Sequence, residues 1–234
     1  MSNGERKKPL YLERKSRVLV VDDHPLVREG LSALINQQDD LTACGSAEDA
    51  PGALHQVAAI RPHVVLVDVS LGNSSGLDLI RDLKIQQPEV ATIVVSMHDE
   101  MLYAERALRA GARGYVMKRE STRNVLTAIR RVLEGGIYLS ENVVTSMASK
   151  VAGAKAAASA NTERLELLSD RELQIFRLLG RGLTSGQIAE QLHLSIKTVQ
   201  AYCARAKEKL GLITALELRR CATRWEDAHA AELA

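Results

Sequence analysis

The stretch 17-RVLVVDDHP-25 decides the fold class, because an apolar run ends in it directly before two carboxylates. Residues 18–21 are all Val or Leu, which is typical of a strand that is buried on both faces. Asp22 and Asp23 follow at once, and neighbouring carboxylates at the end of a core strand repel each other and resist desolvation. Another group must offset this repulsion, and the rest of the chain indicates which one.

Four further apolar runs of strand length follow, separated by helix-length segments whose apolar residues stand three or four positions apart. Val27, Leu31 and Leu34 are one example of this helical spacing. The alternation predicts an α/β fold with a five-stranded, doubly wound parallel sheet that helices cover on both faces. Functional groups of such sheets collect outside the carboxyl ends of the strands. The four runs are 41-LTAC-44, 63-HVVLV-67, 91-ATIVVS-96 and 114-GYVM-117.

From residue 167 onwards the pattern is helical, and three N-terminal capping signals punctuate it. Two short helices joined by a tight turn and followed by a longer helix are typical of a small all-α helix-turn-helix domain. The signals are Ser169 with Glu172, Thr184 with Gln187 and, more weakly, Ser195 with Thr198, and the helices that they open cover 169–182, 184–194 and 195–211.

Composition and charge divide the chain further. The segment 151-VAGAKAAASANTE-163 has almost no large apolar residue and is predicted to be a linker. Residues 167–224 carry ten Lys and Arg against five Asp and Glu, which indicates that this unit meets a polyanion. The predicted divisions are a basic N-terminal arm at 1–16, an α/β domain at 17–136, an extension and linker at 137–166, a helix-turn-helix domain at 167–224 and an acidic tail at 225–234.

The same composition argues against a membrane protein and against a protein stabilised by disulfide bonds. The longest apolar runs are far too short to span a bilayer, and the charged N-terminus has no apolar region of a secretory signal. Cys44, Cys203 and Cys221 are widely spaced, so we expect them to be small core residues in a reducing cytosol. The expectation is therefore a cytoplasmic protein with no membrane partner.

Three carboxylates, one hydroxyl and one ammonium are expected at one edge of the sheet. Clustered carboxylates suit a hard divalent cation, above all Mg²⁺, which would offset their repulsion. A carboxylate beside a cation, an ammonium and a hydroxyl is also typical of a phosphoryl acceptor, with the cationic groups and the hydroxyl holding the charged oxygens. The groups are Asp22 and Asp23 after the first run, Asp68 after the third, Ser96 at the end of the fourth and Lys118 after the fifth.

These residues, in a five-stranded α/β frame, resemble the flavodoxin-like receiver domain of bacterial two-component response regulators. The segments 66-LVDVSLGNSSGLDL-79 and 111-GARGYVMKRES-121 resemble the NarL/FixJ branch in particular. The segment 168–211 is similar to the LuxR-type helix-turn-helix of that branch. The resemblance covers about residues 17–136 and 167–222.

The resemblance implies a role for each residue of the acidic site. Asp68 would be the phosphorylated aspartate, Asp23 would bind Mg²⁺ directly and Asp22 mainly through water, and the main-chain carbonyl of Ser70 would be a further ligand. Ser96 would bond to the phosphoryl oxygen, and Lys118 would pair with it. Tyr115 matches the aromatic switch position of the family. Its ring would rotate inward on phosphorylation, into space that the Ser96 loop vacates. His24 is interpreted as a helix-start residue and not as a ligand.

One departure from the family concerns the loop after Asp68. Gly72 stands where relatives usually have Pro, and the run 72-GNSSG-76 is expected to loosen the loop and to alter the lifetime of the phosphoryl group.

The third C-terminal helix is the candidate for reading DNA. Val199, Cys203, Ala206 and Leu210 share one face and are expected to pack inward. Polar and small residues on the opposite face fit a major groove, with Gln directed to adenine and Arg to guanine or phosphate. These candidate DNA contacts are Lys197, Thr198, Gln200, Ala201, Ala204 and Arg205.

The expected function is that of a DNA-binding response regulator, phosphorylated by a sensor histidine kinase, with phosphorylation controlling dimerisation. By the resemblance, the resting receiver covers the recognition helix, and the helix near 212–221 forms the dimer contact. RNA polymerase is a further candidate partner. The chain would be no enzyme beyond its own phosphoryl transfer and dephosphorylation. Two alternatives are a constitutive DNA-binding regulator and a Mg²⁺-dependent aspartyl phosphohydrolase. Ser70 argues against the phosphohydrolase, because such enzymes usually carry an acid/base carboxylate two residues after the nucleophile.

Overall fold

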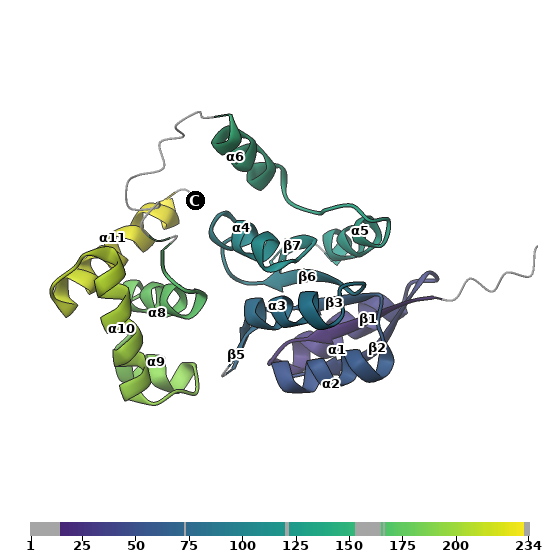
Figure 1. Cartoon of the computed structure of the whole chain (residues 1–234), viewed down its shortest axis with the longest axis horizontal. Coiled ribbons are helices and arrows are strands. Elements are labelled where there is room, and N and C mark those ends of the chain that lie inside the picture. Colours follow the sequence, from purple (N-terminus) through teal and green to yellow (C-terminus); the bar gives the residue numbers. More distant parts are fainter. Residues whose placement is uncertain (1–14, 73, 120–121, 153–164, 166, 232–234) are drawn as a thin grey trace, which may run out of the picture.

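The computed structural model describes residues 15–72, 74–119, 122–152, 165 and 167–231. These residues form an α/β unit followed by a helical unit, with the carboxyl ends of the sheet directed towards the helical unit (Figure 1). The strands of the sheet are β1 (Ser16–Val21), β2 (Leu41–Ala47), β3 (Val64–Val67), β6 (Ala91–Ser96) and β7 (Gly114–Met117).

The five strands form one parallel sheet in the order β2-β1-β3-β6-β7, which confirms the predicted fold class. The chain moves outward from β1 to β2 and then returns past β1 to β3, so the strand order reverses between β1 and β3. Ligands of doubly wound sheets bind outside the carboxyl ends at this reversal. Because Asp22 follows β1 and Asp68 follows β3, the topology alone brings these carboxylates together.

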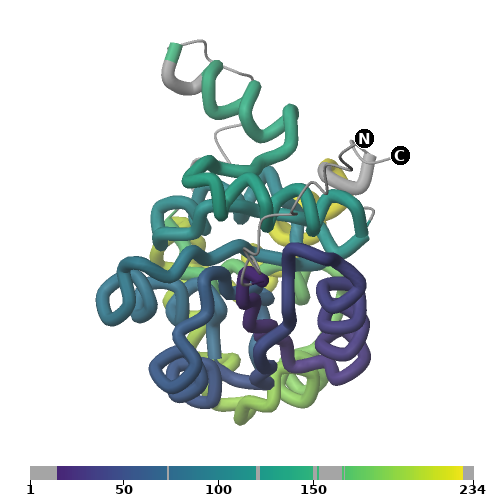
Figure 2. Tube along the Cα trace, turned by 90° about the vertical axis from the view of Figure 1, so that its right-hand side faces the viewer, coloured from purple at the N-terminus to yellow at the C-terminus, as the bar shows by residue number. Residues whose placement is uncertain are grey.

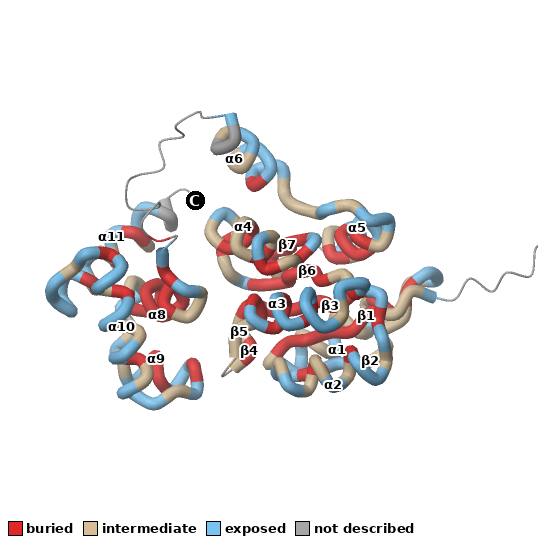
Figure 3. Tube along the Cα trace, viewed as in Figure 1, coloured by how far each residue is buried: buried red, intermediate tan, exposed pale blue. Residues whose placement is uncertain are grey.

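Helices cover both faces of the sheet (Figure 2). The helices α1 and α5 bury Ile35, Val125 and Ile129 against one face, whereas α2, α3 and α4 pack against the other. Strand residues are buried nearly throughout (Figure 3), because each face of each strand meets a helix. The helices are α1 (Pro25–Asn36), α2 (Ala50–Ile60), α3 (Gly76–Gln86), α4 (Glu100–Ala110) and α5 (Thr122–Leu133).

A short antiparallel hairpin interrupts the loop after Asp68. Its strands are β4 (Ser70–Leu71) and β5 (Ser74–Ser75), and Gly72 has a φ of 53° that favours glycine. Gly76 follows the hairpin, where the backbone passes close to Asp68. A Cβ at this position would lie 1.8 Å from the main-chain oxygen of Asp68, so a larger residue does not fit. The sequence predicts a loose loop here, but the structure pairs it into a hairpin.

The predicted extension after the sheet is largely a helix, α6 (Glu141–Val151), which packs against α4. Val143 is buried on it, and Ser140 Oγ donates to Glu100 Oε1 at 2.8 Å. Most of the predicted linker, residues 153–163, lies outside the described residues, as do residues 1–14 of the predicted arm.

The helical unit begins where the capping signals predict. Both hydrogen bonds of the capping box are present for Ser169 with Glu172 and for Thr184 with Gln187. Ser195 accepts from the backbone N–H of Thr198, so the weaker signal also opens a helix. The helices are α8 (Asp170–Gly180), α9 (Ser185–Gln191), α10 (Ile196–Leu210) and α11 (Ala215–Ala231).

The predicted break before an acidic tail at residue 225 is absent, because α11 continues to Ala231. Trp225 is 5% exposed and lies near Phe176, with ring centroids 6.4 Å apart. Arg177 Nε donates to Glu226 Oε1 at 2.9 Å. The tail was predicted from its acidic charge, but one of these acids pairs with α8 and the tryptophan belongs to the core.

No helix among the described residues is long and apolar enough to cross a membrane.

Candidate functional site

The predicted acidic residues and the lysine meet at the carboxyl edge of the sheet. Lys118 Nζ lies 2.5 Å from Asp22 Oδ2 and 2.7 Å from Asp68 Oδ2, and all three side chains are largely buried. One ammonium therefore bridges the carboxylates that end β1 and β3. The sheet supplies this geometry, because β1, β3 and β7 all end at the same edge.

Burial controls the ionisation of this pair. Desolvation raises the pKa of Asp68, and the attraction of Lys118 opposes that shift without cancelling it. Burial disfavours the charge on Lys118, but the carboxylates of Asp68 and Asp22 outweigh it and raise the lysine pKa. The second carboxylate oxygen of Asp68, Oδ1, is buried and has no hydrogen-bond partner among the described residues. This oxygen is therefore available to a cation or to phosphorus.

Asp23 lies at the outer side of the cluster. His24 Nδ1 approaches Asp23 Oδ1 at 2.7 Å and Asp22 Oδ1 at 3.2 Å, and the Gly72 N–H donates to Asp23 Oδ2 at 3.2 Å. Ligand atoms of Asp22, Asp23, His24 and Asp68 lie within 4.8 Å of one another, so this group could hold a metal ion. His24 occupies the N-cap position of α1 and its side chain is 67% exposed, as expected of a helix-start residue.

Ser96 and Tyr115 lie beside the cluster and are both buried. Ser96 Oγ accepts from the backbone N–H of His98 at 3.3 Å, and Tyr115 Oη donates to the carbonyl of His98 at 2.9 Å. The expectation that Tyr115 starts outside and rotates inward does not describe this structure, because its ring is already inside. The hydrogen bond from Tyr115 Oη to the His98 carbonyl stabilises this buried position.

His98 is a residue of the site that sequence reasoning missed. Its Nε2 lies 2.9 Å from Ser70 Oγ, and its ring stacks on Tyr103 with centroids 4.8 Å apart. Burial, followed by the charges of Arg177 and Arg181, lowers the pKa of His98 to about 3, so its ring is neutral near pH 7. A single histidine two residues beyond a strand carries no spacing signal, and only the fold places it against Ser70.

The candidate DNA-reading residues lie together on α10. Lys197, Gln200 and Arg205 are exposed, and Arg205 stacks over the ring of Tyr202 at 4.5 Å. Val199, Ala206 and Leu210 are buried on the opposite face as predicted, and Cys203 is half-buried. The remaining predicted contacts are Thr198, which is half-buried, and Ala201 and Ala204, which are exposed.

Comparison with known proteins identifies both units. A family model of the response regulator receiver domain matches residues 18–130, and a model of bacterial regulatory proteins of the luxR family matches residues 166–222. The oxygen regulatory protein NreC of Staphylococcus aureus is 34% identical over 204 residues, which cover 86% of this chain and 94% of NreC. The chain belongs to the two-component response regulators. The family predicted from the sequence is thereby confirmed.

Two solved structures place the regulator among known folds. A LuxR-family response regulator from Aurantimonas sp. SI85-9A1 is 28% identical with a TM-score of 0.56, and covers 59% of this chain and 99% of that protein. RcsB from Salmonella enterica serovar Typhimurium is 25% identical with a TM-score of 0.54, and covers 89% of this chain and 98% of RcsB. That RcsB structure was solved bound to the promoter P1flhDC in the presence of the phosphomimetic BeF₃⁻.

In this response regulator the DNA-binding domain faces the acidic cluster of the receiver. A pocket of about 320 Å³ contains Asp68 and Lys118 on one wall and Gln174 and Arg177 of α8 on the other. The expectation that the receiver covers the recognition helix is not what the structure shows. Hydrogen bonds join the receiver to α8 and to the segment just before it, and Lys197, Gln200 and Arg205 of α10 are exposed. The capping signals locate α8 in the sequence but say nothing about what it contacts.

Proposed function

We propose that this response regulator is phosphorylated on Asp68 by a sensor histidine kinase, and that phosphorylation controls dimerisation and transcription-factor activity. One observation carries the proposal. Asp68 is a buried carboxylate with one oxygen paired to Lys118 and the other, Oδ1, without a hydrogen-bond partner in the described part of the chain. That arrangement orients the carboxylate and leaves one oxygen to react.

In the proposed reaction a carboxylate oxygen of Asp68 attacks the phosphorus of a phosphohistidine. The new O–P bond forms as the P–N bond to the imidazole breaks, and the imidazole leaves with the bonding electron pair. Lys118 would hold an equatorial phosphoryl oxygen, and the Ser96 hydroxyl would donate to another. Both side chains are buried beside Asp68, so they need little reorganisation to do so.

We propose Mg²⁺ as the cation of the acidic cluster. The cluster fits it, because hard divalent cations prefer carboxylate and carbonyl oxygens and Asp68 Oδ1 accepts no hydrogen bond from the residues that the structure describes. Asp23 would be the direct ligand, Asp22 would act mainly through water, and the Ser70 carbonyl would complete the protein ligands. Bound there, the ion would neutralise charge on the phosphoryl oxygens.

On the DNA side, α10 would enter the major groove of double-stranded DNA. Gln200 and Arg205 would read base edges, and Lys197 would contact phosphate. Promoter-bound RcsB is consistent with this use of a related domain. The exposed residues Ile213, just before α11, and Leu216, in its first turn, offer an apolar surface for a second copy. A dimer would then bind paired half-sites about one helical turn apart.

The proposal places the protein in the cytoplasm, where bacterial DNA, RNA polymerase and the kinase domain of a sensor are accessible. The phosphohydrolase alternative finds less support in the site. The side chain two residues after Asp68 is Ser70, whose hydroxyl is already engaged by His98 and Gln174. A carboxylate acid/base group is therefore missing from the position where such enzymes use one.

The proposal is tested by incorporation of phosphate from acetyl phosphate in the presence of Mg²⁺. We expect the wild-type chain to be labelled, Asp68→Asn to remain unlabelled, and chelation of Mg²⁺ to prevent labelling. Asp40→Asn is a matched control, because Asp40 pairs with Arg130 on the surface and should not alter labelling. Normal labelling of Asp68→Asn, mapped to another residue by mass spectrometry, would show that Asp68 is not the acceptor.

A further inference from the structure

A hydrogen-bond network joins the loop after Asp68 to the first helix of the DNA-binding domain. Arg171 donates through Nη1 to Gln174 Oε1 at 2.7 Å, which fixes the orientation of the Gln174 amide. The amide nitrogen Nε2 therefore faces the receiver, where it donates to Ser70 Oγ at 2.8 Å. Gln174 is 8% exposed, so the bond is shielded from water.

The network continues from Ser70 into the receiver through His98. An amide nitrogen can only donate, so the Ser70 hydroxyl accepts from Gln174. The same hydroxyl lies 2.9 Å from His98 Nε2 and forms a second hydrogen bond there, whose direction depends on the tautomer of His98. The backbone N–H of His98 in turn donates to Ser96 Oγ. A chain of hydrogen bonds thus runs from α8 through Ser70 and His98 to the Ser96 hydroxyl beside Asp68.

Arg171 holds the same loop at a second point. It donates through Nη2 to the carbonyl of Gly72 at 3.0 Å, while the N–H of Gly72 donates to Asp23 Oδ2 at 3.2 Å. The peptide groups of Gly72 are therefore bound by α8 on one side and by the acidic cluster on the other. Movement of α8 would release one of these two restraints.

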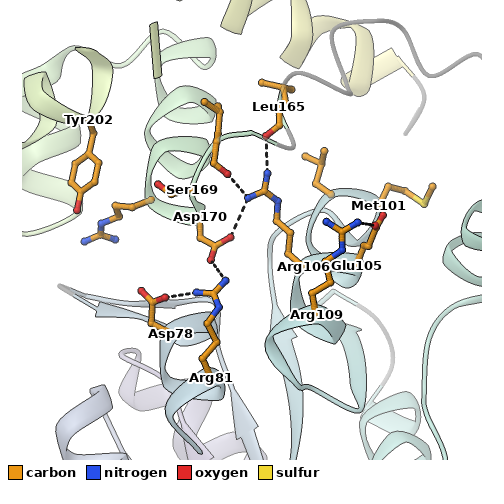
Figure 4. Close-up of a pocket in the computed structure, with 13 residues that line it drawn as sticks. Asp78, Arg81, Met101, Glu105, Arg106, Arg109, Leu165, Ser169, Asp170 and Tyr202 are labelled. Atoms are coloured by element: carbon orange, nitrogen blue, oxygen red, sulfur yellow. Dashed lines mark hydrogen bonds and ion pairs between the residues drawn. The ribbon is translucent and has the colours of Figure 1, made fainter. Parts of the chain in front are cut away.

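Ion pairs at the amino end of α8 keep it against the receiver (Figure 4). Asp170 accepts from Arg81 at 3.1 Å and from Arg106 at 3.2 Å. Arg106 also donates to the carbonyls of Leu165 and Leu168, both at 2.7 Å. Asp170 and Arg106 are only 11% and 16% exposed in their side chains, so water and salt screen this contact less than a surface pair.

We propose that Arg171 and Gln174 of the DNA-binding domain are positioning residues of the acceptor site, which in the docked state hold the loop 70–72 and slow phosphoryl transfer to Asp68. The inference rests on the proposed function of Asp68. Its physical basis is access, because Asp68 is 5% exposed and α8 and α9 form the far wall of the pocket above it. A phosphoryl donor that reaches Asp68 through this pocket would pass between the receiver and that wall.

The coupling is reciprocal. If the docked state of α8 also disfavours the phosphorylated form at equilibrium, then phosphorylation favours undocking by the same equilibrium factor, whereas the change in rate need not equal that factor. The DNA-binding domain would thereby be released from the receiver when Asp68 is modified. This control acts through α8 and does not require the receiver to cover α10.

The test measures the initial rate of phosphorylation of the full chain by acetyl phosphate with Mg²⁺, in which the O–P bond to Asp68 forms and acetate leaves. Gln174→Ala removes one interdomain hydrogen bond and should raise the rate by about fivefold. Ser70→Ala should raise it similarly from the other side of the interface. The double variant should be no faster than the faster single variant, because both changes remove the same bond.

Arg224→Ala is the matched control, since Arg224 is exposed on α11 and should leave the rate unchanged. Because Ser70 and Gln174 lie in different domains, a folding defect in one domain would not produce equal and non-additive increases. Gln174→Ala that is as fast as or slower than the wild type, or additive effects of the two changes, would overturn the proposal. A wild-type chain that takes no phosphate at Asp68 would instead remove the proposed function.

Discussion

At the scale of single residues, Lys118 stabilises the two buried carboxylates that follow β1 and β3, Asp22 and Asp68. Two buried carboxylates would repel each other strongly, and the ammonium between Asp22 and Asp68 converts this repulsion into two ion pairs. The identity of these residues follows from the sequence, because each directly follows a strand. Their distances do not, since they depend on how the five strands are ordered.

Lys118→Ala should slow phosphorylation of Asp68 by acetyl phosphate about 100-fold, the cost typical of losing one group that stabilises charge in the transition state. Labelling kinetics measure the effect directly. Lys84→Ala is the control, because Lys84 is exposed on α3 and carries the same charge. A rate for Lys118→Ala within about twofold of the control would show that the lysine does not hold the phosphoryl group.

At the scale of elements, the capping boxes and the strand runs made most of the fold predictable. Ser169 and Thr184 open helices where expected because their reciprocal bonds are local in sequence. The hairpin β4–β5 was not predicted, because each of its strands has only two residues and no periodicity can develop. The continuation of α11 past Trp225 was missed for a different reason, since its partners Phe176 and Arg177 lie on another helix.

The capping box of α8 gives a prediction about stability and pH. Burial opposes the charge on Glu172, but the hydrogen bonds from Lys209 and from Ser169 outweigh it and lower the pKa of the carboxyl. A carboxyl whose pKa is lowered on folding contributes stability above its unfolded pKa of about 4.3, and this stability is lost as the pH falls through the folded pKa. Glu172→Gln should lower the free energy of unfolding by about 1 kcal/mol at pH 7.

The difference between Glu172→Gln and the wild type should shrink as the pH falls below the unfolded pKa, because the wild-type carboxyl then becomes neutral as well. Urea denaturation at a series of pH values measures both quantities. Glu190→Gln, an exposed change on α9, is the control and should show neither effect. A difference that stays constant across this pH range would mean that the charge of Glu172 is not what stabilises α8.

The recognition helix α10 gives a second prediction at this scale. Lys197→Ala should weaken binding to all DNA sequences alike and reduce the slope of log affinity against log salt by about one unit, if Lys197 contacts a phosphate. Gln200→Ala should instead relax the preference at one base pair, at a cost of about 1–3 kcal/mol there. Binding to sequence libraries at several salt concentrations separates the two, and an unchanged profile would remove Gln200 from the base-reading face.

At the scale of the whole molecule, the interface between the domains could not be predicted from the sequence. Ser70 and Gln174 are 104 positions apart, and neither residue belongs to a motif that names a partner. The open face of α10 also changes how control is expected to work. Because most of its candidate DNA contacts are already exposed, we expect phosphorylation to act through release of α8 and through dimerisation, which would bring two α10 helices to paired half-sites.

The central claim is that modification of one carboxylate changes DNA binding by the whole chain. The most direct measurement is the affinity of the full-length protein for DNA selected from a random pool, with and without acetyl phosphate and Mg²⁺. The wild-type chain should bind paired half-sites at least about tenfold more tightly after treatment, because a dimer holds both sites at once. Asp68→Asn should bind the same DNA equally in both conditions. An affinity of the wild type that does not change, or an equal increase in Asp68→Asn, would contradict the account.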